Sequence, residues 1–271
     1  MEKNFLIVLS TGRTGTKFLS QLFTAIGLGH ISHQGKFSRT ANIVGNLGLC
    51  PGFQEWSKIL LKNMLTRVDR IGPTADPLLS IAHILLLDQN KKSSRPKILH
   101  VVRDPRNFVT SFMNWRKQRL RRMVLHHLIP FWQPNPCNME NSGGFGSYFN
   151  MSKFEHFCWI WTFKNSLFEK KVKEYRVESF FLKFELLMDL KDPGKKPTET
   201  INALSSFLNV PESFLIEQVK NLPVLNSSRS KVFPKWDQWT SKQATILENQ
   251  CGPLMRKYGY GSEPEWEKLI N

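Results

Sequence analysis

A short turn near residue 12 combines glycines with positively charged side chains. Gly12 and Gly15 lie within residues 10–16, Arg13 lies between them, and Lys17 follows. Glycine lets a backbone approach a ligand closely, and the N–H groups at the start of a helix attract anions. Together with the two positive charges, these residue types predict a binding site for a phosphate or sulfate group. The alternative is a plain structural turn.

An apolar run and a helical pattern flank this turn and would position it. Residues 5–9 read FLIVL, which has the length and composition of a buried strand. The turn departs from the phosphate loop of nucleotide hydrolases, because Gly12 and Gly15 are three positions apart and Lys17 does not directly follow the second glycine. We therefore expect a strand, an anion-binding loop of a different form, and a helix. The helical spacing is that of Phe18, Leu19, Leu22 and Phe23.

The same arrangement recurs in a second segment, KILHVVRDPRNFVTSFMNW. Residues 98–102 form a largely β-branched run of the kind found in buried parallel strands. Asp104 suits a helix N-cap, and Pro105 suits the first helical position. Arg103 thus lies at the carboxyl end of a strand, where open α/β sheets bind ligands. Ser111 lies eight residues further along, on the predicted helix.

Composition and charge limit the class of protein and partner. The chain has 271 residues, of which 41% are hydrophobic, and a net charge of +16. The hydrophobic content is typical of a globular protein, and the length suits one large α/β domain or two small ones. The charge implies an anionic partner, such as a phosphorylated nucleotide, an acidic glycan, an anionic membrane surface or nucleic acid, without choosing among them.

Cysteine usage and the first residues bear on the cellular compartment. The cysteines form no C-x-x-C pair, which argues against a zinc site or a disulfide framework and fits reduced thiols. The apolar run at residues 5–9 is too short for a signal peptide or a membrane span. We therefore expect a cytoplasmic protein without a bound metal. The cysteines are Cys50, Cys137, Cys158 and Cys251.

Strand and helix patterns continue to alternate along the chain. Two more strands are predicted, at residues 30–34 and at residues 179–187. Asp76 is predicted to cap a helix, and Thr240 begins a capping-box pattern. Because there is no internal repeat or domain linker, we expect residues 1–271 to form one doubly wound α/β domain, with a central, mainly parallel sheet flanked by helices. Further helices are predicted around residues 59–67, 78–86, 154–168, 201–208 and 246–258.

Residues 116–150 interrupt this alternation. Residues 116–122, RKQRLRR, hold five positive side chains in seven positions. Residues 133–147 form a long polar loop rich in proline, glycine and asparagine. The basic run is either a solvated face of the preceding helix or a contact for an acceptor, a membrane or nucleic acid. Because long loops in compact domains are often lids, we expect residues 116–150 to be an acceptor-side insertion or lid.

These motifs together resemble those of the sulfotransferases that use 3′-phosphoadenosine 5′-phosphosulfate (PAPS), especially the soluble bacterial type. Residues 10–16 look like the family's 5′-phosphosulfate loop, and Arg103 with Ser111 looks like its 3′-phosphate motif. Residues 183–187 resemble a family strand that reads Tyr-Glu-Asp-Leu, and residues 251–260 resemble its C-terminal helix. The resemblance implies a P-loop-type three-layer fold. The donor-binding residues that it implies are Thr11, Gly12, Arg13, Thr14, Gly15, Thr16, Lys17, Arg103 and Ser111.

The implied reaction moves the sulfuryl group of PAPS to a hydroxyl acceptor in line, leaving 3′-phosphoadenosine 5′-phosphate (PAP), and the family needs no metal. Arg13 and Lys17 would neutralise the charge that spreads over the sulfuryl oxygens in the transition state. Phe184 stands where the family often has a tyrosine against the adenine. The basic, glycine-containing C-terminal loop of the cytosolic enzymes is not evident, and Arg229 and Lys231 are candidates to replace it.

The acceptor hydroxyl needs a base within hydrogen-bond reach. Residues 3–54 contain no carboxylate, so a base near the second predicted strand must be a histidine. His33 is our first candidate, with His30 and Asp76 as further candidates. A core role is expected for His100, because it lies inside a predicted strand.

Two other functions stay open at the level of sequence. One is a P-loop phosphotransferase or nucleotide kinase, which magnesium dependence would identify. The other is nucleic-acid binding through residues 116–122, which predicts an affinity that falls steeply with salt. The composition suits a glycan, a glycolipid or an anionic small molecule as the acceptor of a sulfotransferase, without selecting one.

Overall fold

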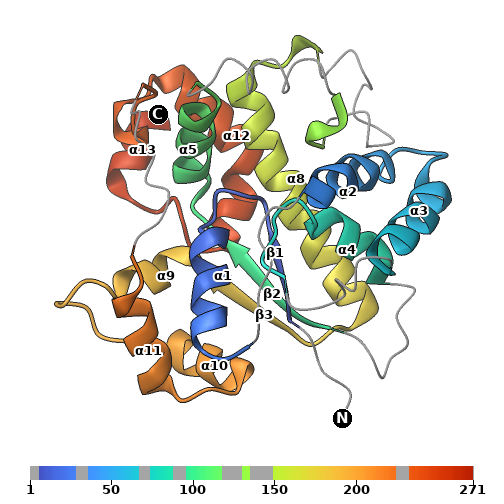
Figure 1. Ribbon diagram of the computed structural model, residues 1–271. Helices are drawn as coiled ribbons and strands as arrows, with labels where there is room; N and C mark the ends of the chain where they lie inside the picture. Colours follow the sequence, from blue (N-terminus) through green and yellow to red (C-terminus); the bar gives the residue numbers. More distant parts are fainter. Residues whose placement is uncertain are drawn as a thin grey trace.

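A parallel sheet of three strands lies at the centre of the described structure (Figure 1). A computed structural model of the protein describes residues 6–28, 36–66, 74–87, 96–117, 130–134, 149–223 and 232–270. The strands are β1 (Leu6–Ser10), β2 (Lys97–Val102) and β3 (Ser179–Lys183), in the order β1-β2-β3. Ser10 lies opposite Val101, and Val101 lies opposite Leu182. The carboxyl ends of the strands therefore meet at one edge of the sheet.

Helices account for most of the other described residues. Those that precede β3 are α1 (Thr16–Ala25), α2 (Lys36–Leu47), α3 (Gln54–Thr66), α4 (Ser80–Leu86), α5 (Pro105–Lys117), the short η3 (Pro130–Trp132) and α8 (Lys153–Tyr175). Those that follow β3 are α9 (Phe184–Asp189), α10 (Glu199–Leu208), α11 (Glu212–Asn221), the short η5 (Trp236–Gln238), α12 (Ser241–Lys257) and α13 (Pro264–Ile270). Among these described helices, none is long and apolar enough to cross a membrane.

Helices cover both faces of the sheet, as parallel strands with buried residues on both sides require. Leu6 and Val8 of β1 join a hydrophobic core with α1 and α10. Ile7 and Leu9, which point to the opposite face, join a core with α4 and α8. Figure 1 shows α1 on one side of the strands and α8 on the other. The predicted three-layer α/β fold with a parallel sheet is confirmed.

A single bridge extends the sheet beyond β1. The carbonyl of Thr74 accepts the N–H of Val8 at 2.9 Å, and the N–H of Thr74 donates to the carbonyl of Leu6 at 3.0 Å. The bridge is parallel, so the residues after Thr74, including Asp76, continue toward the end of β1 where the glycine turn begins. The strand predicted at residues 30–34 lies outside the described residues.

Two predicted elements are wrong in part. The strand predicted at residues 179–187 ends at Lys183, and its second half is helix α9. The apolar run there hid the change, because short apolar runs do not distinguish strand from helix. Asp76 does not cap α4 directly, since its Oδ1 accepts the N–H of Leu78 at 3.0 Å and α4 begins only at Ser80.

The two predicted helix starts at Asp104 and Thr240 are confirmed. Asp104 Oδ1 accepts the N–H of Arg106 at 2.8 Å, at the beginning of α5. Thr240 and Gln243 form a capping box at the beginning of α12, each side chain bonding the other's backbone N–H. These caps fix the points at which the chain leaves β2 and enters the last long helix.

Three histidines are buried and neutral in the folded protein. His83, His100 and His156 are 6%, 4% and 4% exposed. Burial lowers the pKa of each from 6.5 to about 4. Nε2 of His100 bonds Oδ1 of Asn165 at 3.0 Å inside the core, which confirms the core role expected for His100.

These histidines predict acid destabilisation well above the pH at which most carboxylates titrate. An unfolded chain protonates them near pH 6.5, whereas the folded protein does not until about pH 4. Stability is therefore lost as the pH falls through this window, by up to about 1.4 kcal/mol per pH unit for each histidine. Urea denaturation at a series of pH values measures the slope. In His100→Gln the slope should decrease by about one proton, and an unchanged slope would contradict the assignment.

Candidate active site

The loop between β1 and α1 has a strained, left-handed backbone. Gly12, Arg13 and Gly15 have φ values of 88°, 57° and 72°. This region favours glycine, and Arg13 adopts it without being one. Helix α1 begins at Thr16, its N-cap residue Gly15 makes no side-chain cap, and its first turn contains no acidic residue. The amino end of α1 therefore presents N–H groups and the positive end of the helix dipole to an anion.

Buried hydroxyl groups hold the loop in this shape. Ser10 Oγ accepts the N–H of Gly12 at 2.9 Å and is hydrogen bonded to Thr14 Oγ1 at 2.5 Å. The N–H of Ser10 donates in turn to Ser80 Oγ at 3.2 Å. Lys17, by contrast, is exposed on the first turn of α1. The buried threonines among the predicted donor-binding residues are Thr11, Thr14 and Thr16.

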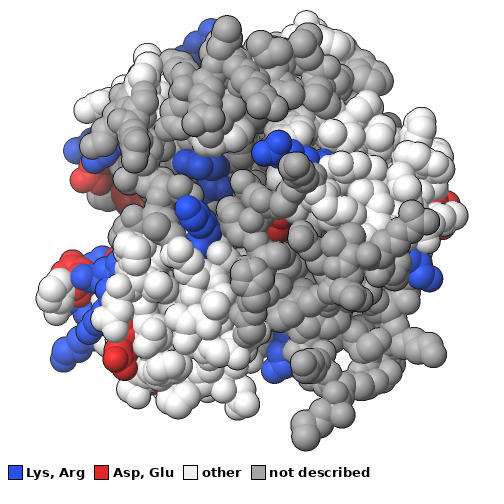
Figure 2. All heavy atoms as spheres, viewed as in Figure 1, with Lys and Arg blue, Asp and Glu red and all other residues white. Residues whose placement is uncertain are grey.

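Two arginines and a serine join this loop to α5. Arg103 Nη1 donates to the carbonyl of Arg13 at 2.9 Å, and Arg13 Nε donates to Ser111 Oγ at 3.0 Å. Burial lowers the pKa of Arg103 and the nearby carboxyls of Glu185 and Asp104 raise it, while an arginine stays protonated in proteins. The fold thus brings together the three residues predicted to bind anions. Figure 2 shows Lys and Arg side chains gathered in a hollow on the face where Figure 1 places this loop.

Phe184 lies directly against the loop. It is the first residue of α9, and its ring packs edge-to-face on Phe18 with the ring centroids 6.3 Å apart. A Cβ atom added to Gly15 would overlap the ring of Phe184. Glycine is therefore required at position 15 both by its positive φ and by this contact. The predicted contact of Phe184 with an adenine stays a prediction.

Several predicted residues cannot be placed, because they lie outside the described residues. Asp76 is the base candidate that the structure describes, and it is 1% exposed. Pro77, the next residue, would lie 3.8 Å from a Cβ atom on Gly12, so Asp76 is close to the loop. The predicted residues outside the described ranges are His30, His33, Arg229, Lys231 and most of residues 116–150.

A buried ion pair fixes the chain immediately after β2. Arg106 Nη2 lies 2.6 Å from Asp104 Oδ2 and 2.7 Å from Glu263 Oε1. The guanidinium group also lies over two indole rings, 4.4 Å from the ring centroid of Trp236 and 5.2 Å from that of Trp266. The start of α5 is thereby tied to the segment that leads into α13. Arg106 lies within the segment that the sequence singled out, at residues 97–115, but its pairing with Glu263 was not predicted.

A cavity of about 760 Å³ lies away from the loop, where β3 meets the carboxyl ends of α8 and α12. Its walls are basic and aromatic, and they contain none of the residues predicted to bind the donor. Among the described residues, this cavity is therefore separate from the cluster formed by Arg13, Arg103 and Ser111, which we call the arginine cluster. The wall residues include Lys170, Lys173, Phe181, Lys257 and Tyr258.

A comparison with protein families adds to this geometry. A model described as a sulfotransferase domain matches residues 3–259. The chain belongs to the sulfotransferase family. The match includes the glycine turn, Arg103, Ser111 and Phe184, so the described residues that are predicted to bind the donor in this sulfotransferase lie within the family domain, whereas Glu263 lies just beyond it. No curated protein and no solved structure gave a significant match. The predicted family is confirmed, and with it a P-loop-type fold and sulfuryl transfer in general terms.

The contact of Gly15 with Phe184 predicts a large effect of a small substitution in this sulfotransferase. Gly15→Ala should destabilise the fold by more than the roughly 1–2 kcal/mol expected of a left-handed alanine, because its Cβ would also overlap a ring. Gly52→Ala is the matched control, since Gly52 has a φ of 82° and nothing within 4 Å. Urea denaturation compares the two. The extra destabilisation of Gly15→Ala relative to Gly52→Ala should vanish in a Phe184→Ala background. Equal losses of unfolding free energy in Gly15→Ala and Gly52→Ala would contradict the contact.

Proposed function

We propose that this sulfotransferase moves the sulfuryl group of PAPS to a hydroxyl group of an acceptor. The observation that carries the proposal is the hydrogen-bonded chain from Arg103 through Arg13 to Ser111. It joins the glycine turn after β1 to the arginine after β2, two positions that lie 90 residues apart in sequence. One crevice can therefore offer two anion sites to a single ligand.

The residues present fit a nucleotide with anionic groups at both ends of its ribose. The uncapped amino end of α1, together with Arg13 and Lys17, suits the 5′-phosphosulfate. Arg103, just before α5, and Ser111, within α5, suit the 3′-phosphate, since guanidinium groups and hydroxyls both donate to phosphate oxygens. When bound, PAPS supplies the sulfuryl group that is transferred.

Catalysis in this proposal rests on position and charge. Negative charge grows on the oxygens around sulfur and on the bridging oxygen as the group is transferred, and fixed positive groups stabilise it. Ser111 accepts Nε–H of Arg13 and Arg103 binds the Arg13 carbonyl, so the guanidinium is oriented by Ser111 and the backbone below it by Arg103. Lys17 is an exposed positive charge on the first turn of α1, and α1 adds the positive end of its dipole. The positive charge thus comes from the protein itself.

The acceptor hydroxyl is activated by a base, for which His33 is our proposal. In this proposal the neutral imidazole of His33 takes the proton of the hydroxyl group as the new bond to sulfur forms. Asp76 is the alternative because it lies beside Gly12, but its carboxylate is buried and already accepts the N–H of Leu78. As the acceptor we propose a glycan or another hydroxyl compound with negative charge, since the chain carries a net charge of +16.

Calorimetry with PAP, the product nucleotide, tests the proposal. The wild-type protein should bind PAP, and Arg103→Ala should weaken binding by about 10- to 100-fold, because a hydrogen bond to a charged group is lost. Arg256→Ala is the matched control, since the Arg256 side chain is 50% exposed and pairs with Glu248 away from the loop. Failure of the wild-type protein to bind PAP would overturn the proposal.

The identity of the base predicts a separation of turnover from binding. His33→Ala should lower turnover by roughly 100-fold or more while PAP affinity stays within about twofold, because a base acts on the acceptor and not on the nucleotide. Asp76→Asn, measured in the same way, tests the alternative. If His33→Ala keeps its rate and Asp76→Asn loses it, Asp76 is the base.

A further inference from the structure

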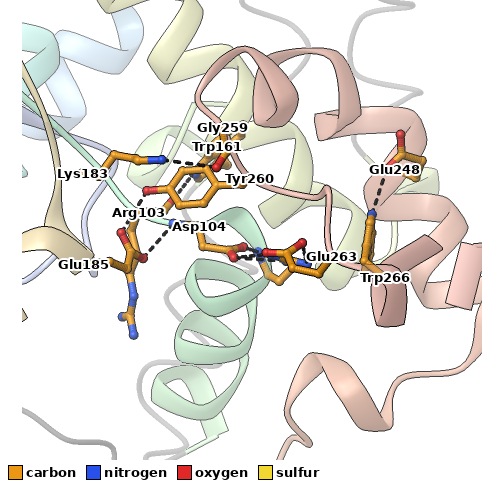
Figure 3. A network of polar contacts seen from close by, with 11 residues as sticks. Arg103, Asp104, Trp161, Lys183, Glu185, Glu248, Gly259, Tyr260, Glu263 and Trp266 are labelled. Atoms are coloured by element: carbon orange, nitrogen blue, oxygen red, sulfur yellow. Dashed lines mark hydrogen bonds and ion pairs between the residues drawn. The ribbon is translucent and has the colours of Figure 1, made fainter. Parts of the chain in front are cut away.

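Glu185 accepts two hydrogen bonds next to the arginine that is proposed to bind the 3′-phosphate. Its Oε1 accepts the backbone N–H of Asp104 at 3.0 Å, and its Oε2 accepts the hydroxyl of Tyr260 at 2.9 Å. Figure 3 shows Glu185 between Tyr260 and the turn that carries Arg103 and Asp104. Glu185 belongs to the first turn of α9, and Tyr260 follows α12. Two distant segments therefore meet at this turn.

The backbone around Arg103 is held on both sides. The carbonyl of Arg103 accepts Nε1–H of Trp161 at 2.9 Å, and the next N–H, that of Asp104, is the one bound by Glu185. The side chain of Asp104 is fixed in turn by Arg106. With its backbone immobilised in this way, Arg103 directs its guanidinium group to the carbonyl of Arg13.

The carboxyl group of Glu185 is largely buried, which is unfavourable for a negative charge. Burial raises the pKa of this carboxyl, and the hydrogen bonds from Asp104 and Tyr260 partly offset the effect. In the described structure its hydrogen-bond donors are a backbone N–H and a hydroxyl, and the nearby guanidinium of Arg103 is the positive charge that it influences. A glutamine at this position would fill the same space without the cost of burying a charge, but it has one acceptor oxygen, whereas the carboxylate accepts a hydrogen bond on each of its two oxygens. The carboxylate therefore has a use beyond packing.

Tyr260 is held in place for this contact. Lys183 Nζ donates to the carbonyl of Gly259 at 3.2 Å and lies 4.6 Å from the centroid of the Tyr260 ring. Gly259 and Gly261 on either side have φ values of 72° and 78°, and the turn packs on Met255. The hydroxyl of Tyr260 is thereby aimed at Glu185 by a rigid turn.

We propose that Glu185 and Tyr260 are a positioning pair for Arg103, and that this pair sets the preference of the site for a nucleotide with a 3′-phosphate over the same nucleotide without one. The inference rests on the proposed PAPS-dependent function. Neither residue touches the nucleotide in this proposal, because both act through the turn at residues 103–104. Their loss should leave the contacts at the glycine turn intact and should reduce the contribution of Arg103.

The test is a ratio of two affinities, measured by calorimetry. PAP carries a 3′-phosphate and adenosine 5′-phosphate does not, so the ratio of their dissociation constants isolates the 3′-phosphate contact. Glu185→Gln and Tyr260→Phe should each reduce the preference for PAP by about 3- to 10-fold, with the affinity for adenosine 5′-phosphate changed by less than about twofold. The double variant should lose little more than the larger single loss, because both changes act on the same contact between position 185 and Tyr260.

Glu248→Gln is the matched control. Glu248 accepts Nε1–H of Trp266 at 3.1 Å and pairs with Arg256, so the same substitution changes a carboxylate that is linked to the turn at residues 103–104 only indirectly, through the packing of Trp266 on Arg106. Its ratio should equal that of the wild type. Tyr260→Phe decides the question if Glu185→Gln does not fold, which thermal unfolding of each variant reveals.

The outcomes separate this inference from the function on which it rests. If the wild-type protein prefers PAP and both variants keep that preference, the positioning role is wrong and the proposed function stands. Equal weakening of both nucleotides means a general loosening of the fold and also overturns the positioning role. If the wild-type protein shows no preference for PAP, the proposed function and the inference fail together.

Discussion

Parallel pairing of β1 with β2 and of β2 with β3 determines where the functional residues lie. In a parallel sheet all strands end at the same edge, and the register places Ser10, Val101 and Leu182 side by side. The glycine turn, Arg103 and Glu185 each follow one of these strand ends within a few residues. Helix caps and ion pairs then fix the direction of each side chain. Without this register, however, the glycine turn, Arg103 and Glu185 would not lie close together.

Positive charge accumulates at this edge, and the protein controls it with few carboxylates. Arg13 and Arg103 are hydrogen bonded through a backbone carbonyl, and Lys17 lies nearby on α1. Asp104 is occupied by Arg106 inside the core, which leaves Glu185 as the described carboxyl that most strongly influences Arg103. A ligand with several negative charges would neutralise the positive charge of these side chains, and a doubly phosphorylated nucleotide is such a ligand.

Sequence reasoning could predict what is encoded locally. The glycine turn, the Arg103 and Ser111 spacing and the cap at Asp104 each depend on neighbouring residues, and the structure contains all three elements. Helix α2 was missed because buried polar residues interrupt its apolar pattern: Asn42 and Asn46 are buried and donate to carbonyls of η3. Tyr260 was missed as a partner of Glu185 because 75 residues separate them, and no spacing in a single sequence reveals such a contact.

The ion pair of Arg106 with Glu263 has a consequence for any attempt to isolate the glycine turn. It connects residues 157 positions apart, and the bond between Glu185 and Tyr260 connects residues 75 positions apart. No local element contains both partners of either contact, so neither contact can form in an isolated strand–turn–helix unit. The geometry around Arg103 thus depends on the docking of the segment that follows α12. Competence to bind the proposed nucleotide is accordingly a property of the assembled fold and not of the strand–turn–helix unit that contains the glycines.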